Sequence, residues 1–436
     1  AETIRDATRT AIDGWRADGR ALAQVESQQI TARHPTSTLD ATVRIAPGPV
    51  LSYGNIAVSG AEDVRPERVR EIAGLLPNHR FDPEEITRAE ANLRRTGAFT
   101  SATIIEGDTA GPNDTLPMEI QVVEQVPRRL GFGAEYSSIK GLTLSGYWLH
   151  RNLLGGAERF RVEAEVTGLS GGTGGIDYGL GASFLRPATL RSDVDFYADA
   201  MVEQLDEPNF FERQVGVEAG LIRRIREEAV IEVGFGYRAG EIDDDLGFRS
   251  YRLLTFPIEG TRDQRDDPFD ATRGYYANLE IIPFVGLSNV DNGARIMGDF
   301  RYYNSPGEAD RVTLAFRGQI GAVFGAEAAN VPADFLFYSG GGGTVRGQPY
   351  QSLAVDLGGG LEIGGTGFVG LQSEARFDVT DTIGVVGFYD VGFIGTEALG
   401  LSDVDLPSGA GGAMRYAHGP VRIRLDLATP ADGPVD

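Results

Sequence analysis

The stretch RVTLAFRGQI, Arg311–Ile320, shows the pattern that runs through most of this 436-residue chain. Val312, Leu314 and Phe316 occupy alternate positions, and Arg317 is among the polar residues of the opposite parity. Successive side chains of a β-strand point to opposite faces of a sheet. The alternation therefore predicts a strand with one apolar face and one polar face.

The same alternation recurs after Pro127, where helical signals vanish and we predict about fifteen strands. Further examples are Arg159–Val166, Asp193–Ala200 and Val421–Leu427. Alternation is also typical of a soluble β-sandwich, which likewise has one apolar face. Here, however, many strands approach the length of about ten residues that crosses a bilayer at a tilt. Tight turns also alternate with long loops, and the polar face mixes acids with bases. These features favour an all-β, antiparallel, up-and-down transmembrane barrel over residues 128–436.

Residues 48–127 show a different order, in which two helices separate the strands. We predict three strands, at Ser52–Ser59, Phe99–Glu106 and Leu116–Val126. The first helix follows an N-cap at Asp63 and ends before Gly74. The second begins at Asp82, with Pro83 in its first turn and Glu85 completing a capping box. The result is an α+β module of the form β-α-α-β-β, which is too small for a large active-site cleft.

Residues 1–47 resemble the second half of a similar module. The sequence predicts a helix over Ile4–Asp18 and strands near Ala21–Ala32 and Thr38–Ile45. We therefore expect further chain before residue 1, and three domains in all: 1–47, 48–127 and 128–436.

Composition excludes several classes of function. Sixty-three acidic residues outnumber forty basic ones, which gives a net charge of −23 and argues against a nucleic-acid partner. The chain has no cysteine and four scattered histidines, so a zinc cluster or a thiol nucleophile is excluded. No hydrolase or transferase constellation is evident. We expect no enzyme, no cofactor and no metal site.

Four local features have a functional and a structural interpretation, and the structural one is favoured each time. The run Gly340–Gly347 lacks the Lys-Ser/Thr and the helix of a phosphate-binding loop. Asp193 and Asp195 alternate with apolar residues, as charges on a wet lumen face do. The acidic run Glu241–Asp245 lacks the spacing of a calcium loop and is expected to be a solvated loop tip. The aromatic residues expected in an interfacial girdle are Trp148, Phe210 and Phe211.

The most specific stretch is Asp334–Leu353, DFLFYSGGGGTVRGQPYQSL. Its Val345-Arg346-Gly347 resembles the VRG signature of the BamA/TamA outer-membrane assembly superfamily. Other segments that resemble the family are RNLLGGAERF (Arg151–Phe160), DPFDATRG (Asp267–Gly274), GFYDVG (Gly387–Gly392) and HGPVRIRLDLATP (His418–Pro430). The β-α-α-β-β modules are similar to the family's POTRA domains. The sequence around the signature, FLFYSGG…VRG, favours the TamA-like branch of the family.

The resemblance implies a barrel in the outer membrane of a Gram-negative bacterium, with POTRA modules in the periplasm. It implies an assembly factor whose partners are unfolded outer-membrane proteins or autotransporters, outer-membrane lipid and, for the TamA-like branch, a TamB-like periplasmic protein. Free sheet edges in the modules and at the barrel seam are the expected docking points for client strands. A two-partner secretion pore is the alternative, and a diffusion porin ranks last.

The chain also departs from the family pattern. Gln348 follows the signature where an aromatic residue is usual, and Tyr350 comes two residues later. The family closes its barrel with a sixteenth strand that ends in an aromatic residue, whereas this chain stops at Asp436. We therefore expect about fifteen of sixteen strands.

The resemblance places Arg346 at the tip of a loop, Gly325–Gly365, that folds back into the lumen. Alternation supplies the expected partners of Arg346 independently. If Val369 and Leu371 face lipid, Glu374 faces the lumen, and Tyr389 on the lipid side likewise turns Asp390 inward. We predict that Arg346 forms charge-assisted hydrogen bonds with Glu374 and Asp390.

Overall fold

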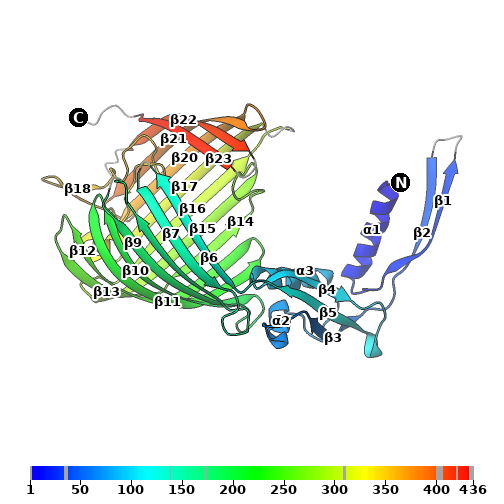
Figure 1. Cartoon of the computed structure of the whole chain (residues 1–436). Helices are drawn as coiled ribbons and strands as arrows, with labels where there is room; N and C mark the ends of the chain where they lie inside the picture. Colours follow the sequence, from blue (N-terminus) through cyan, green and yellow to red (C-terminus); the bar gives the residue numbers. More distant parts are fainter. Residues whose placement is uncertain are drawn as a thin grey trace. The chain divides into compact units, whose positions relative to one another are not determined.

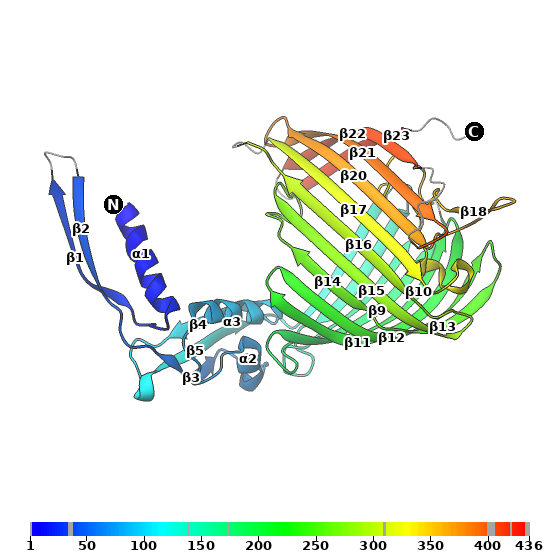
Figure 2. The same ribbon diagram turned by 180° about the vertical axis from the view of Figure 1, so that it is seen from behind.

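The computed structural model of the chain describes residues 2–33, 38–137, 139–171, 174–307, 311–398, 406–418 and 421–431. It divides into two compact units. The first contains residues 1–129, 148–161 and 184–196, and the second contains the remainder (Figures 1 and 2). Within the described ranges, no helix is long and apolar enough to cross a membrane.

The first unit begins with a helix and a two-stranded antiparallel sheet. Helix α1 spans Glu2–Ala17, and strands β1 (Gln24–Arg33) and β2 (Thr38–Ala46) pair with each other. These elements lie within a few residues of their predicted positions. Strand β1 is exposed along its whole length.

The next elements have the predicted order β-α-α-β-β. They are β3 (Ser52–Ser59), α2 (Pro66–Ala73), α3 (Pro83–Arg95), β4 (Phe99–Glu106) and β5 (Thr115–Glu124). Strand β5 lies in the middle of the sheet, parallel to β3 and antiparallel to β4. One apolar core joins the helices to the sheet, and its fully buried members include Leu51, Tyr53, Val69, Leu93, Leu116 and Ile120.

Both helix starts differ in detail from the sequence prediction. Helix α2 begins at Pro66 after Arg65, so the predicted cap at Asp63 is wrong. The backbone amide of Asp63 instead donates to the carboxylate of Glu124. Asp82 does cap α3, but its backbone amide donates to the Tyr53 hydroxyl at 3.1 Å. A tertiary contact thus occupies the donor that the predicted capping box would have used.

The outer edges of this three-stranded sheet are partly occupied. On β4, the amide of Ile104 donates to the Glu90 side chain of α3 at 2.9 Å. On β3, the amide of Tyr53 donates to the carbonyl of His79, and Arg70 donates to the carbonyl of Ile56 at 2.9 Å. The expectation of free strand edges in this module is therefore not met at these positions.

The remaining strands form one antiparallel sheet that curves into a barrel wall (Figures 1 and 2). Neighbouring strands follow one another along the chain, which confirms the predicted up-and-down topology. The strands are β6 (Arg128–Ser137), β7 (Gly141–His150), β8 (Arg159–Thr167), β9 (Asp177–Arg186), β10 (Val194–Glu207), β11 (Phe210–Arg226), β12 (Ala229–Asp244), β13 (Arg249–Thr255), β14 (Ile258–Asp263), β15 (Gly274–Ser288), β16 (Gly293–Asn304), β17 (Val312–Phe324), β20 (Gly367–Asp378), β21 (Ile383–Gly395), β22 (Ser408–His418) and β23 (Val421–Pro430).

In the described part of the chain this sheet has sixteen strands, of which β13 and β14 share one position between β12 and β15. The pairing order runs from β6 to β23. Residues 432–436, on which the expectation of a missing last strand partly rests, lie outside the described part of the chain.

Three structural expectations from the sequence need correction. Asp195 faces a protein interior rather than a wet lumen, since it is buried and accepts a hydrogen bond from the amide of Ala188 at 3.1 Å. Phe210 is not in a lipid-facing girdle, because it is buried against Tyr338 with ring centroids 5.8 Å apart. Most of the acidic run thought to be a loop tip, up to Asp244, belongs to strand β12.

The Tyr53 hydroxyl offers a test of the first unit, because it both donates to the carbonyl of Asp82 and accepts from the amide of Asp82. Tyr53→Phe should destabilise the unit by about 1–3 kcal/mol, since the partly buried amide of Asp82 loses its acceptor. Burial also raises the pKa of Tyr53, so the effect should not vary between acidic and neutral pH. Hydrogen exchange at the start of α3 measures the change. Tyr136→Phe, at an exposed position on β6, is the matched control and should have no effect.

Candidate functional site

The candidate site is the long segment between β17 and β20, which lies against the inner wall of the barrel. It contains two short 3₁₀ turns, Ala328–Asn330 and Ala333–Phe335, and a hairpin of strands β18 (Val355–Gly358) and β19 (Leu361–Ile363). We call residues 325–366 the lumen loop. A connection of this length needs contacts of its own to be ordered.

Apolar contacts hold the first half of the lumen loop. The ring of Phe335 meets Phe284 of β15 edge to face at 5.3 Å, and Phe337 stacks on Phe368 of β20 at 5.9 Å. Together with neighbours from β12, β13 and β17, these residues form a buried cluster. The cluster is an apolar core inside a lumen whose other inward positions are mostly polar.

Polar contacts attach the loop to several strands. Asp334 forms an ion pair with Arg238 of β12 at 3.0 Å. Arg317 of β17 donates to the carbonyl of Gly343 at 3.1 Å, and Gln372 of β20 donates to the carbonyl of Thr344 at 2.7 Å. Because β12 and β20 are well separated in the sheet order, the loop is anchored at distant points of the wall.

The structure brings Arg346, Glu374 and Asp390 together. The Nε and Nη2 atoms of Arg346 donate to the two carboxylate oxygens of Asp390 at 2.6 and 2.7 Å, and Nη1 donates to Oε1 of Glu374 at 2.6 Å. The backbone amide of Arg346 also donates to Asp390 at 3.1 Å. Arg346 is 7% exposed and Asp390 is 0% exposed. The guanidinium group of Arg346 thus binds Asp390 in bidentate geometry and Glu374 through its remaining nitrogen.

Residues beyond the predicted three complete the arrangement. The guanidinium carbon of Arg346 lies 3.7 Å from the ring centre of Phe388, in cation–π geometry. Glu374 also pairs with Arg376 at 2.9 Å and with Arg424 of β23 at 2.7 Å. Glu374 is thus shared by three arginines, and it links the loop to β20 and β23.

Glycines allow the loop backbone to approach the wall closely. A Cβ atom at Gly409 of β22 would collide with the carbonyl of Arg346, and one at Gly392 of β21 would press on Val345. Gly347, at φ +98°, lies against the carbonyl of Thr429 on β23. Val345 itself is fully buried. Each residue of the Val345-Arg346-Gly347 signature therefore meets the wall formed by β21, β22 and β23.

Some of these residues gave a weak signal in the sequence. Phe388 belongs to the GFYDVG segment and lies two residues before Asp390, so strand alternation places both side chains in the lumen. Phe388 is thus an apolar residue at an inward position of the strand. Arg424 has inward parity in the last strand, but nothing local marks it as a partner of Glu374. The pairing of Asp334 with Arg238 depends on the path of the loop, which no sequence pattern reveals.

A second family-like segment, DPFDATRG, forms a tight turn between β14 and β15. The carboxylate of Asp266 accepts hydrogen bonds from the Thr272 hydroxyl at 2.5 Å and from the amides of Thr272 and Arg273 at 3.0 and 3.1 Å. Asp270 of the same turn pairs with Arg415 of β22. This turn therefore connects β14 and β15 to a distant strand of the barrel.

A family model described as the Omp85 superfamily domain matches residues 152–435. This range begins in the turn between β7 and β8, and it covers the lumen loop and all strands from β8 to β23. The chain belongs to the Omp85 superfamily. The match confirms the family resemblance, and the TamA-like branch stays a prediction.

Solved Omp85-like structures share the fold at low sequence identity. BamA from Haemophilus ducreyi lacking POTRA domains 1–3 has 14% identity and a TM-score of 0.76, covering 99% of this chain and 90% of that one. CdiB from Acinetobacter baumannii has 10% identity and a TM-score of 0.62, with coverages of 99% and 78%. CdiB from Escherichia coli has 14% identity and a TM-score of 0.55, with coverages of 98% and 80%. These likenesses show the fold, with POTRA-like α/β elements preceding a β-barrel.

Arg346→Ala in this Omp85 protein should loosen the lumen loop without unfolding the barrel. It leaves the carboxylate of Asp390 buried and uncompensated, which costs about 3–5 kcal/mol for a largely buried pair. We expect faster proteolysis and faster hydrogen exchange over residues 340–352. Arg265→Ala is the matched control, because Arg265 is a partly buried arginine that pairs with Asp263 instead of the loop. Equal loop protection in both variants would contradict this account.

The Asp266 turn should respond to acid. Partial burial alone would raise the pKa of Asp266, but the hydrogen bonds from Thr272, Arg273 and Asp267 lower it to about 2. Its folded-state pKa is below the unfolded value of about 3.9. The stabilisation is therefore present above about pH 4 and is lost as the pH falls through about 2. Asp266→Asn should weaken protection of the turn amides at neutral pH, and the difference from the unmodified chain should disappear once the pH is below about 2. A difference that persists at that pH would be inconsistent with a carboxylate effect.

Proposed function

We propose that this Omp85 protein is an outer-membrane protein assembly factor, which inserts client proteins by adding their strands at the barrel seam. The observation that carries the proposal is the occupied lumen. A loop attached to β12, β17, β20 and β21 obstructs passage of a polypeptide through the barrel. Strand addition at the edge of the sheet can proceed while this loop stays in place.

The first barrel strand has the properties of a templating edge. Strand β6 is one end of the pairing order, and Phe132 on it is 87% exposed. Gly131 and Gly133 leave space that Tyr147 and Ser145 of β7 occupy, so larger residues at these positions would clash. With two glycines contributing no side-chain packing of their own, β6 should exchange partners at a low energetic cost.

We propose that residues 1–47 are the C-terminal part of one POTRA module and residues 48–127 a second POTRA module, and that both lie in the periplasm and receive the client. The edges of the β3-β5-β4 sheet are partly occupied, so the β1-β2 sheet, whose strand β1 is exposed along its length, is the better candidate for the receiving surface. Val25, Ile30 and Leu39 are exposed apolar residues of this sheet. They suit an extended segment with alternating apolar side chains.

The proposed partners are unfolded outer-membrane proteins or autotransporters. The sequence FLFYSGG…VRG around the signature supports the TamA-like branch and, with it, a TamB-like periplasmic partner. The proposal involves no covalent chemistry. A two-partner secretion pore is the alternative, since the same fold occurs in CdiB, and it would require the lumen loop to leave its place.

Purified protein in liposomes tests the proposal. It should accelerate folding of an outer-membrane client, measured by heat-modifiable gel migration, while ion conductance stays low because the loop occupies the lumen. No acceleration, combined with export of an unfolded substrate into the liposomes, would favour the secretion pore.

Single-cysteine cross-linking tests the site of strand addition, because the chain contains no cysteine. Phe132→Cys on β6 should form a disulfide with a cysteine in the terminal strand of a stalled client. Phe300→Cys is the control, because Phe300 is also an exposed phenylalanine but lies on β16, away from the ends of the pairing order. Equal cross-linking at both positions would argue against templating at β6.

A further inference from the structure

The only lysine of the chain, Lys140, lies in the turn between β6 and β7. The Ser137 hydroxyl accepts a hydrogen bond from the backbone amide of Lys140 at 2.9 Å. The Nζ atom of Lys140 donates to Oε1 of Glu207, the last residue of β10, at 3.0 Å, and the Asp177 carboxylate of β9 is 3.9 Å from the same nitrogen. The turn that follows the first barrel strand is therefore joined by an ion pair to a strand that is not its neighbour in the sheet.

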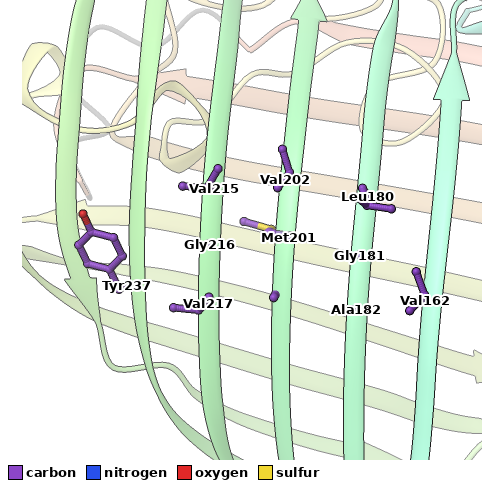
Figure 3. Close-up of a pocket in the computed structure, with 11 residues that line it drawn as sticks. Val162, Leu180, Gly181, Ala182, Met201, Val202, Val215, Gly216, Val217 and Tyr237 are labelled. Carbon is purple, nitrogen blue, oxygen red and sulfur yellow. The ribbon is translucent and has the colours of Figure 1, made fainter.

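Glu207 is on the lumen face of β10. Val202 of the same strand is exposed and lines an apolar hollow on the outer face of β8 to β12 (Figure 3). Side chains alternate along a strand, so the odd-numbered positions of β10 turn inward. Leu205 agrees with this assignment, because it packs against the buried apolar cluster of the lumen loop. The carboxylate of Glu207, whose side chain is 10% exposed, therefore points into the interior that the lumen loop occupies.

The lumen loop reaches this end of β10 through Tyr350 and Gln351. The Tyr350 hydroxyl is within hydrogen-bonding reach of the Glu207 carboxylate, and it accepts from Nε2 of Gln351 at 3.2 Å. The carbonyl of Gln351 accepts from the side chain of Asn209, in the turn after β10, at 3.0 Å. Burial raises the pKa of Tyr350 and the charge of Glu207 raises it further, so the phenol keeps its proton and can donate it. Glu207 thus links Tyr350 of the loop to Lys140 of the first hairpin.

The glycine run of the lumen loop leaves room for Tyr350. A Cβ atom at Gly341, where φ is +84°, would come within 3.2 Å of the tyrosine ring, and one at Gly340 would collide with the carbonyl of Pro349. The amide of Gly341 also donates to the carbonyl of Gln348 at 3.0 Å. The run that lacks the features of a phosphate-binding loop therefore packs closely against the segment that carries Tyr350.

We propose that Tyr350, Glu207 and Lys140 form a latch by which the lumen loop holds the β6–β7 hairpin and restrains strand addition at the edge of β6. The inference rests on the proposed function, because β6 is the proposed site of addition. Among the described strands, β6 is paired with β7 alone. A contact that is made only in the resting arrangement stabilises that arrangement, so its loss shifts the hairpin toward more open states. The latch is separate from the contacts of Arg346, which are made with β20 and β21.

Amine labelling tests the latch without reference to function, because Lys140 carries the only side-chain amine of the chain. An acetylating reagent applied to the folded full chain should modify Lys140 about two- to fivefold faster in Tyr350→Phe than in the unmodified protein, as expected for a weakened, partly exposed ion pair. Glu207→Gln should have at least the same effect, because it removes the ion pair itself. Tyr338→Phe is the matched control, since the Tyr338 hydroxyl bonds to the backbone of Gly364 within the loop, and it should leave the labelling rate unchanged. Peptide mass spectrometry measures the rates.

Hydrogen exchange of the β6–β7 turn tests whether the latch acts as one unit. Lys140→Met and Tyr350→Phe should each speed exchange of the amides of residues 139–143. The double variant should exchange no faster than the more affected single variant, because the two links act in series through Glu207. Lys140→Arg keeps the cation and should retain the protection of the turn. Additive effects of the two substitutions would contradict a single latch.

Client folding in liposomes separates the latch from the proposed function. Tyr350→Phe and Lys140→Met should raise the rate of client folding by about the same two- to fivefold factor, because the restrained state is less populated, whereas Lys140→Arg should leave the rate unchanged. If the unmodified protein folds no client, the proposed function fails, and the labelling rates alone then decide whether the loop holds the hairpin. The latch is overturned if Lys140 is labelled equally fast in Tyr350→Phe and Tyr338→Phe, or if labelling rises in an active protein while client folding does not.

Discussion

The buried carboxylate of Asp390 is the constraint on which the rest of the lumen depends. A fully buried charge is costly unless it is paired and hydrogen-bonded. Arg346 meets this need with three hydrogen bonds, and it reaches Asp390 only because the lumen loop crosses the barrel interior. The path of the loop, the glycines of β21 and β22 and the sharing of Glu374 all follow from placing one guanidinium there.

Because the loop occupies the lumen, partners would bind to the other surfaces of the protein. Phe132 on the first strand β6 is exposed, outside the lumen loop. The edges of the β3-β5-β4 sheet are partly occupied by side chains and by backbone of the same unit. Client strands would therefore act on parts of the chain that the lumen loop does not cover.

The errors of the sequence prediction share a physical cause. Asp63 has the residue type of a helix cap, but Pro66 fixes the first turn and Glu124 binds the amides near Asp63. Phe210 has the composition of a girdle residue, yet it packs on Tyr338 of the loop. In each case a residue distant in sequence competes with the local preference, and the tertiary contact prevails because it buries more surface or satisfies more donors.

The sequence by itself determined the strand alternation, the β-α-α-β-β module and the inward parity of Glu374 and Asp390. These follow from the period of two in a strand and from local capping and turn chemistry, which neighbouring residues encode. Only the tertiary structure decided that Arg424 shares Glu374 and that Phe388 lies under Arg346. Those arrangements depend on the register between strands and on the path of a long loop, and they are fixed when the whole sheet has formed around the loop.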